Sequence, residues 1–119
     1  KNIKLPVSAP FHCKLMNRAT EIMGREIENK NFRDVEMKLI SNVTADEIAN
    51  KDDLKKLLIK QIESRVRWRE SVIKMIDKGV NQFIEIGPGK VLSGLVKRIN
   101  KNVKINSINS EIDIKDLEV

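Results

Sequence analysis

His12 and Cys13 are neighbours in the segment "PVSAPFHC", and they are the only histidine and the only cysteine in the chain. An imidazole titrates near neutral pH, so His12 can act as a general base if a rigid turn holds its ring at an open site. The alternatives are that His12 caps the helix predicted to follow it, or bonds within the turn. Cys13 is expected to be a small buried residue, because adjacent side chains in a turn diverge.

A general base needs a nucleophile, and the sequence offers no obvious one. It lacks the G-x-S-x-G motif, the strained strand-to-helix turn that exposes a serine hydroxyl. One histidine and one adjacent cysteine do not supply the ligand set of a zinc site. We therefore expect neither a bound metal nor a cofactor.

A second candidate for chemistry is the segment "EIGPGKVLSGL", which carries Lys90 in a glycine-rich turn. Its spacing differs from that of a phosphate-binding loop, G-x-x-x-x-G-K-[ST], since the turn is shorter and Ser93 stands too far along. Gly87 and Gly89 are therefore expected to allow a sharp reversal and close packing of the next helix. A weak anion site at the amino terminus of that helix is the alternative.

The hydrophobic pattern predicts the elements that must position these residues. Helices are predicted over residues 14–29, from an Asn50 cap to about 62, from about 67 to 78 with Gly79 as its stop, and from 90 to about 99. Strands are predicted over residues 3–8, 35–43, 82–86 and 103–108.

This alternation of strands and helices predicts the α/β class, with a partial, mostly parallel sheet flanked by helices. The four strands would make a small sheet with at least one open edge, which suggests that another segment completes it. The first residue is Lys1, and the chain begins within a predicted strand. We therefore expect a piece of a longer polypeptide.

The chain has 23 basic and 17 acidic residues, a net charge of +6. Scattered charges, an absence of tyrosine and few other aromatic residues argue against nucleic acid as a partner. The basic residues around the third and fourth predicted helices form either a solvated face or a docking surface for an acidic partner. They are Arg65, Arg67, Arg69, Lys97 and Arg98.

Targeting signals are also lacking in the sequence. No apolar run approaches the roughly 20 residues that cross a bilayer, and no signal peptide is visible, so no membrane association is expected. A single cysteine cannot form an internal disulfide, which favours the cytoplasm.

Several separated motifs, taken in their order, resemble one enzyme family. They are "LPVSAPFHCKLM", "SNVTA", "KQI…VRWRESV…MIDKGV" and "FIEIGPGKVLSGLVKRI". Together they resemble the carboxyl-terminal part of bacterial malonyl-CoA:acyl-carrier-protein transacylases. The resemblance implies a serine–histidine acyltransferase of fatty-acid biosynthesis on an α/β-hydrolase-like core with a small ferredoxin-like subdomain. Residues 1–109 would be the carboxyl-terminal part of its catalytic domain, and residues 110–119 a tail.

The resemblance also implies roles for individual residues. His12 corresponds to the catalytic base, and Gln61 to the residue whose backbone carbonyl accepts a hydrogen bond from the imidazole Nδ1–H. Phe11 would favour a malonyl over a methylmalonyl group. Lys97 and Arg98 would lie on the face that docks the acidic carrier protein. The implied partners are malonyl-CoA, acyl carrier protein and the amino-terminal part of the enzyme.

The sequence departs from the family pattern in two ways. Glu63 and Arg65 stand where relatives usually have an aromatic residue and a proline, so a looser loop near Gln61 is expected. The family's serine, its oxyanion-hole glutamine and its malonyl-binding arginine belong to segments outside this sequence. The chain is therefore predicted to be inactive alone. The alternatives are a truncated relic, a carrier-interaction module and, third, a phosphate-binding domain built on the Gly87 turn.

Overall fold

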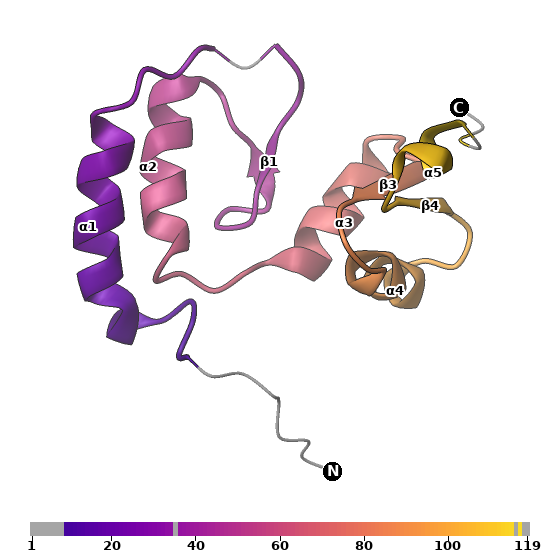
Figure 1. Ribbon diagram of the computed structural model, residues 1–119, viewed down its shortest axis with the longest axis horizontal. Helices are drawn as coiled ribbons and strands as arrows, with labels where there is room; N and C mark the ends of the chain where they lie inside the picture. The colour runs from indigo at the N-terminus through magenta and orange to yellow at the C-terminus, as the bar shows by residue number, and fades with distance from the viewer. Residues whose placement is uncertain (1–8, 35, 116, 118–119) are drawn as a thin grey trace. The chain divides into compact units, whose positions relative to one another are not determined.

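The computed structural model describes residues 9–34, 36–115 and 117. The chain divides into two compact units, Lys1–Trp68 and Arg69–Val119. Figure 1 shows the helices and strands of each unit along the chain. The strand predicted over residues 3–8 lies outside the described residues.

The first unit is built on two helices that contact each other along their length (Figure 1). A short 3₁₀ helix, η1 (Lys14–Met16), leads into α1 (Asn17–Glu28), and α2 spans Lys51–Gln61. The Asn50 side chain accepts a hydrogen bond of 2.9 Å from the Asp53 amide, which satisfies one free amide at the start of α2. The predicted helices and the Asn50 cap are therefore confirmed.

In the sequence between these helices, a short hairpin stands in place of the strand predicted over residues 35–43. Strands β1 (Ile40–Ser41) and β2 (Asp46–Glu47) pair antiparallel, and the Ala45 amide donates to the Ser41 carbonyl across the turn. Residues 36–39 are not a strand, and the side chain of Met37 is 82% exposed. The prediction was wrong there because apolar alternation produces a strand only where a partner strand and a covering layer exist.

The second unit holds a parallel strand pair. Helix α3 (Trp68–Asp77) leads to β3 (Gln82–Ile86), α4 (Val91–Ile99) and β4 (Lys104–Ile108). Strands β3 and β4 are parallel and in register from Gln82↔Lys104, and α4 packs against both. Gly79 follows α3 with φ 93°, as its predicted role as a helix stop requires. The α/β class is thus confirmed.

Two predictions need correction, one about the sheet and one about the carboxyl-terminal tail. The described residues form two separate two-stranded sheets, not one four-stranded sheet, and only the β3–β4 pair is parallel. The predicted tail also contains a helix, α5 (Glu111–Lys115), which contacts β4. The Asp113 carboxylate accepts bonds of 2.8 Å from the Asn109 and Ser110 amides at its start, and these bonds lower the pKa of Asp113.

The face of β3 that points away from α4 is open. The Glu85 carboxylate bonds to α4, so alternation along the strand puts Ile84 and Ile86 on the opposite face. Their side chains are 40% and 80% exposed. Parallel sheets are normally covered on both faces. The strand pair therefore has one covered and one uncovered face among the described residues.

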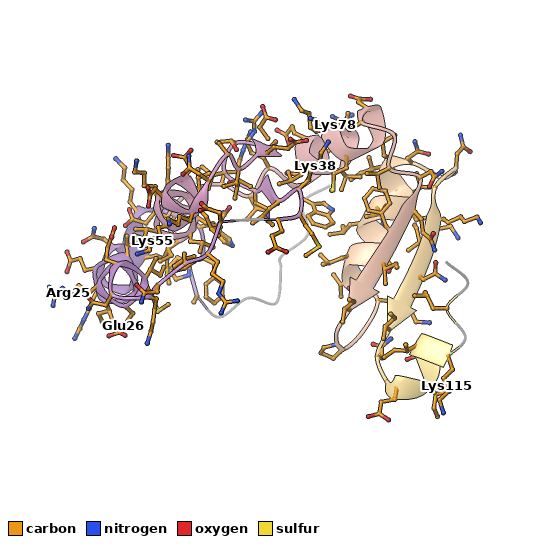
Figure 2. All side chains as sticks on the ribbon, turned by 90° about the horizontal axis from the view of Figure 1, so that it is seen from above. Arg25, Glu26, Lys38, Lys55, Lys78 and Lys115 are labelled. Atoms are coloured by element: carbon orange, nitrogen blue, oxygen red, sulfur yellow. The ribbon has the colours of Figure 1, made fainter. Side chains whose placement is uncertain are left out.

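Charged side chains are spread over both units. Figure 2 labels examples on α1, on α2, before β1, after α3 and on α5. The positive charge of the chain is therefore not confined to one element. Among the described residues, none of the helices combines the length and apolarity needed to cross a bilayer.

Candidate active site

His12 lies in a tight turn directly before η1. The Phe11 amide donates to the Ala9 carbonyl at 3.0 Å, and the Cys13 thiol donates to the Pro10 carbonyl at 3.1 Å. His12 itself has φ 59°, in the left-handed region. A non-glycine residue there costs about 1–2 kcal/mol. Backbone strain of this kind clusters at functional sites, which favours a functional role for this turn.

The His12 ring bonds to a residue far away in the sequence. Its Nδ1 lies 2.9 Å from the carbonyl oxygen of Gln61, 49 residues along the chain. A carbonyl can only accept, so Nδ1 carries the proton in this bond. In the neutral ring Nε2 is then left with a free lone pair, which is the form a general base needs.

The hydrogen bonds around His12 distinguish between the three roles predicted for it: a helix cap, a bond within the turn and a general base. The residue at the cap position of η1 is Cys13, and no side chain caps that helix. The ring also does not bond within its own turn, because its partner is Gln61. His12 is exposed, and its Nε2 has no hydrogen-bond partner among the described residues. Both structural alternatives are therefore wrong, and one ring nitrogen is open.

Gln61 can serve His12 because it is the last residue of α2. The last four carbonyls of a helix have no partner inside it, and one of these accepts from the imidazole. The half-buried Gln61 side chain has a second contact, since its Nε2 donates to the Ser64 carbonyl at 3.2 Å. Gln61 thus contacts both the histidine and the loop that follows α2.

The loop after Gln61 is tied down at several points. The Glu63 carboxylate lies 3.5 Å from Asn17 Nδ2, at the start of α1. At the other end of the loop, Arg67 donates from its amide to Asn42 and from its Nη1 to Thr44, both carbonyls at 2.8 Å. The loop expected to be loose, because it lacks the aromatic residue and proline of its relatives, therefore has polar anchors instead.

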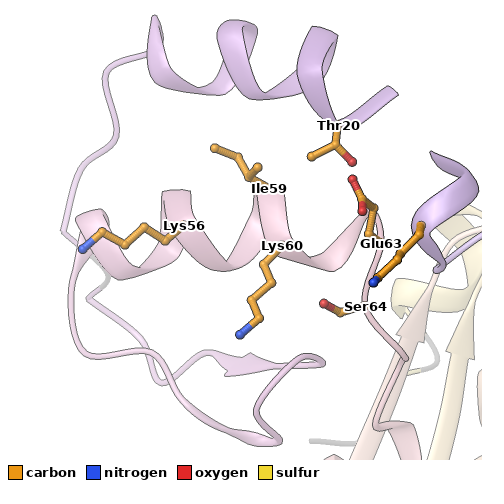
Figure 3. Close-up of a pocket in the computed structure, with 7 residues that line it drawn as sticks. Thr20, Lys56, Ile59, Lys60, Glu63 and Ser64 are labelled. Carbon is orange, nitrogen blue, oxygen red and sulfur yellow. The ribbon is translucent and has the colours of Figure 1, made fainter. Parts of the chain in front are cut away.

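A shallow groove of about 560 Å³ opens beside Glu63, between α1 and α2 (Figure 3). Its lining comes from η1, α1, α2 and the following loop: Lys14, Thr20, Lys56, Ile59, Lys60, Glu63 and Ser64. In Figure 3, Ile59 points towards α1, while Thr20 and Glu63 face each other. No local pattern predicts this groove, because segments far apart in the sequence line it.

The other predicted site residues are exposed. The Phe11 side chain is 59% exposed, so it does not pack in the core of the described residues. Lys97 and Arg98 are exposed on the last turn of α4, in the second unit. The structure thus joins His12 to Gln61, with Phe11 adjacent in the chain, whereas the two basic residues belong to the other unit.

The glycine turn does not form an anion site. Gly87 and Gly89 have φ 133° and 92°, as expected for a sharp reversal. The amides of Leu92 and Ser93, at the start of α4, donate to the Glu85 carboxylate at 3.0 and 2.7 Å. Hydrogen bonds, first of all from the Ser93 side chain, hold the pKa of Glu85 below its ordinary value of 4.5.

The phosphate-binding alternative is therefore wrong, because the chain's own carboxylate occupies the amides that an anion would need. An acidic residue in the strand just before the glycine turn was the signal that could have revealed this. Within the part of the chain that the structure describes, no three histidine, cysteine or acidic side chains cluster as a metal site would require.

Comparison with known proteins confirms the resemblance noted in the motifs, although no protein-family model matches. The chain is 47% identical over 107 residues to the malonyl CoA-acyl carrier protein transacylase of Bacillus subtilis. This match covers 90% of this chain and 34% of the relative. It is 43% identical over 111 residues to the protein of that name from Staphylococcus aureus, covering 93% of this chain and 36% of the relative.

Solved structures give the same result. A malonyl CoA-acyl carrier protein transacylase from Clostridium perfringens matches with TM-score 0.88 and 39% identity, over 96% of this chain and 36% of that one. An acyl-carrier-protein-S-malonyltransferase from Bartonella henselae matches with TM-score 0.88 and 39% identity, over 94% and 36%. The chain spans about a third of the length of the relatives it matches.

Proposed function

We propose that this chain, a homologue of about one third of the malonyl CoA-acyl carrier protein transacylases, supplies the histidine base for malonyl transfer. The donor would be malonyl-CoA, and the acceptor the phosphopantetheine thiol of acyl carrier protein, in cytoplasmic fatty-acid biosynthesis. Residues 1–109 would belong to the acyltransferase domain and residues 110–119 to its tail. The nucleophilic serine would come from outside this chain.

In the first half-reaction, His12 Nε2 removes the proton of the serine hydroxyl while the serine oxygen attacks the thioester carbonyl carbon. The tetrahedral intermediate then breaks its carbon–sulfur bond. The imidazolium returns the proton to the departing thiolate, so coenzyme A leaves as a thiol and a malonyl-serine ester remains.

In the second half-reaction, the same nitrogen removes the proton of the carrier thiol. The sulfur attacks the ester carbonyl, the carbon–oxygen bond to serine breaks, and the serine oxygen takes the proton back. The imidazole therefore accepts a proton twice and donates a proton twice in each catalytic cycle. It must keep one tautomer throughout the cycle.

The observation that carries the proposal is the pairing of one engaged and one open ring nitrogen. The bond from Nδ1 to the Gln61 carbonyl selects the tautomer in which Nε2 can accept a proton, and the ring is exposed. No carboxylate is needed for this, because a backbone carbonyl orients the ring as the carboxylate does in a triad.

The rest of the site would come from a polypeptide matching the other two thirds of the relatives. The open face of β3, with Ile84 and Ile86 exposed, supports this because such a face is normally covered by another layer. A base without a nucleophile and an oxyanion hole has nothing to activate. We therefore expect no malonyl transfer by the isolated chain.

Two further assignments follow the family pattern. Phe11 would occupy the space needed by a 2-methyl group and so favour malonyl over methylmalonyl. Lys97 and Arg98 would attract the acidic carrier protein, and both are exposed on the last turn of α4.

The test is a chimaera in which this chain replaces the matching 107 residues of the Bacillus subtilis relative. We expect the chimaera to transfer malonyl groups to acyl carrier protein, while the isolated chain does not. Turnover by the isolated chain would contradict the proposal. So would a folded chimaera without activity, since the site would then not be completed by the relative's other part.

Replacing His12 by alanine in the active chimaera should lower malonyl transfer by about 10²–10⁴-fold, the usual contribution of general base catalysis. Lys30→Ala, an exposed residue after α1, is the matched control and should retain activity. A His12→Ala chimaera with full activity would remove His12 from the mechanism.

The second candidate is a carrier-interaction module without catalysis, favoured by the exposure of Lys97 and Arg98. It predicts that the isolated chain binds acyl carrier protein in a salt-sensitive manner, while the chimaera remains inactive. The two candidates are therefore separated by the same chimaera.

A further inference from the structure

The Gln61 residue contacts two partners through different atoms. Its carbonyl accepts from His12 Nδ1 at 2.9 Å, and its side-chain Nε2 donates to the Ser64 carbonyl at 3.2 Å. Both atoms belong to Gln61 itself. Any movement of the backbone after α2 therefore moves the carbonyl that holds the imidazole.

The backbone after Gln61 keeps one bond of 3₁₀ type and one of α-helical type. The Ile62 amide still bonds to the Ile59 carbonyl at 3.3 Å, and the Ser64 amide to the Lys60 carbonyl at 3.1 Å. No proline restricts residues 62–67. The Gln61 side chain closes this turn from within, because it bonds across to the Ser64 carbonyl.

A second contact joins the turn to the element that carries the histidine. Asn17 Nδ2 lies 3.5 Å from the Glu63 carboxylate, and Asn17 begins α1, directly after η1. The two segments joined by the His12–Gln61 bond are thus joined a second time, through Asn17 and Glu63. The longer distance makes this the weaker of the two contacts.

We propose that the Gln61 side chain is a positioning group for His12: by closing the turn over residues 61–64, it holds the Gln61 carbonyl on Nδ1. Glu63 assists by tying this turn to Asn17. The polar clamp formed by Gln61, Ser64, Glu63 and Asn17 takes the place of the rigid loop that the sequence lacks. This deepens the proposed function, because it names what keeps the base in one tautomer.

The single histidine of the chain makes a direct test possible. In ¹⁵N-labelled protein at alkaline pH, where a histidine ring is neutral, the two ring ¹⁵N shifts report the ratio of the Nδ1–H to the Nε2–H tautomer. No residue assignment is needed, and couplings to the ring protons distinguish Nδ1 from Nε2. Gln61→Met keeps the length of the side chain but removes its donor. We expect this ratio to fall by about two- to tenfold, the effect of losing one hydrogen bond.

Two variants serve as controls. Lys60→Met changes the preceding residue of α2 to the same side chain but leaves the clamp intact, so the ratio should stay at its original value. Gln61→Lys restores a donor long enough to reach the Ser64 carbonyl, and it should recover most of the ratio. Comparing Gln61→Lys with Gln61→Glu, whose carboxylate cannot donate, keeps the test valid if Gln61→Met does not fold.

An unchanged ratio in a folded Gln61→Met or Gln61→Glu protein would overturn the proposal. The same would follow if Lys60→Met lowered the ratio as much. For Glu63, alanine should lower the ratio, and glutamine, which keeps an acceptor oxygen, should restore it. The tautomer ratio is read without any malonyl transfer, so failure of the clamp and failure of the proposed function are distinguishable.

Discussion

Each unit of this chain uses a side chain from elsewhere to satisfy the end of a helix, but the results differ. In the second unit, Glu85 accepts from two amides at the start of α4, a short distance along the chain. In the first unit, His12 donates to the last carbonyl of α2 from 49 residues away. Both contacts answer the same requirement, since helix ends leave backbone groups unpaired.

The difference lies in what remains free afterwards. The Glu85 carboxylate takes the amides of Leu92 and Ser93 at the start of α4, so these two amides are not open to an external anion. The His12 ring uses one nitrogen and leaves the other open. A group that can bond twice gains a chemical function from the same kind of contact. The residue type at the helix end therefore decides whether a group with free bonding capacity remains (His12, an open site) or whether the helix end is only capped (Glu85, a closed site).

After the loss of His12 itself, the largest expected effect concerns Phe11, the exposed neighbour of the open ring. In the active chimaera, Phe11→Ala should lower the ratio of kcat/KM for malonyl-CoA over methylmalonyl-CoA by roughly 10-fold or more, as expected when packing excludes a single methyl group. Phe32→Ala is the control, because Phe32 packs against Lys55 instead. An unchanged ratio in Phe11→Ala would remove Phe11 from selectivity.

Glu85→Ala should turn the closed site into an open one. We expect a lower melting temperature at neutral pH, because two amides lose their acceptor. Binding of inorganic phosphate, which we do not expect for the original protein, should become measurable by titration. If the variant keeps its melting temperature and still ignores phosphate, the Glu85 contact does not close the site.

The same carboxylate predicts a pH dependence. The folded pKa of Glu85 lies below its ordinary value of 4.5, so its stabilisation is present above 4.5 and lost as pH falls through the lowered value. The difference in melting temperature between the original protein and Glu85→Ala should therefore shrink in acid. Asp113 also has a lowered pKa, but it is present in both proteins and cancels in this difference.

A smaller effect should come from the strained backbone at His12. His12→Gly and His12→Ala both remove the imidazole, but only glycine adopts φ 59° without penalty. We expect the glycine variant to be more stable than the alanine variant by about 1 kcal/mol, measured by urea unfolding. Equal stabilities would mean that the turn relaxes when the ring is absent.

The smallest effect should be on the carrier. Replacing Lys97 and Arg98 by glutamine should weaken carrier binding by a few-fold at low salt, with little difference at high salt, because exposed charges are screened. Lys101→Gln, another exposed lysine just beyond α4, is the matched control. Equal weakening by the control would leave only general charge attraction.

Local patterns predicted most of the elements in both units. The Asn50 cap, the Gly79 stop and the strand over 82–86 follow from residue types at known positions, and the structure has them. Longer-range features escaped. The strand expected over 35–43 shrinks to Ile40–Ser41 because strand pairing with β2 covers only these two residues, and backbone bonding between the described residues reaches no further than the Leu39 carbonyl. A local pattern cannot show how far a partner strand extends.

The candidate site divides in the same way. Chemistry alone picked out His12, but it left open whether the ring was a helix cap, because that depends on where residue 61 lies in space. The Gln61 carbonyl entered through the family resemblance and not through spacing. The clamp by Gln61 Nε2 and the closure of the anion site by Glu85 were not foreseen, since both depend on side-chain directions that a sequence does not contain.

In the proposed mechanism, the open nitrogen of His12 moves a proton for a serine outside this chain. The most direct test is the single-turnover rate at which the chimaera forms its malonyl-serine ester, compared with that of the His12→Gln chimaera. We expect ester formation to be at least about 10²-fold slower without the imidazole. Equal rates in two folded proteins would contradict the account, because the serine would then be activated without His12.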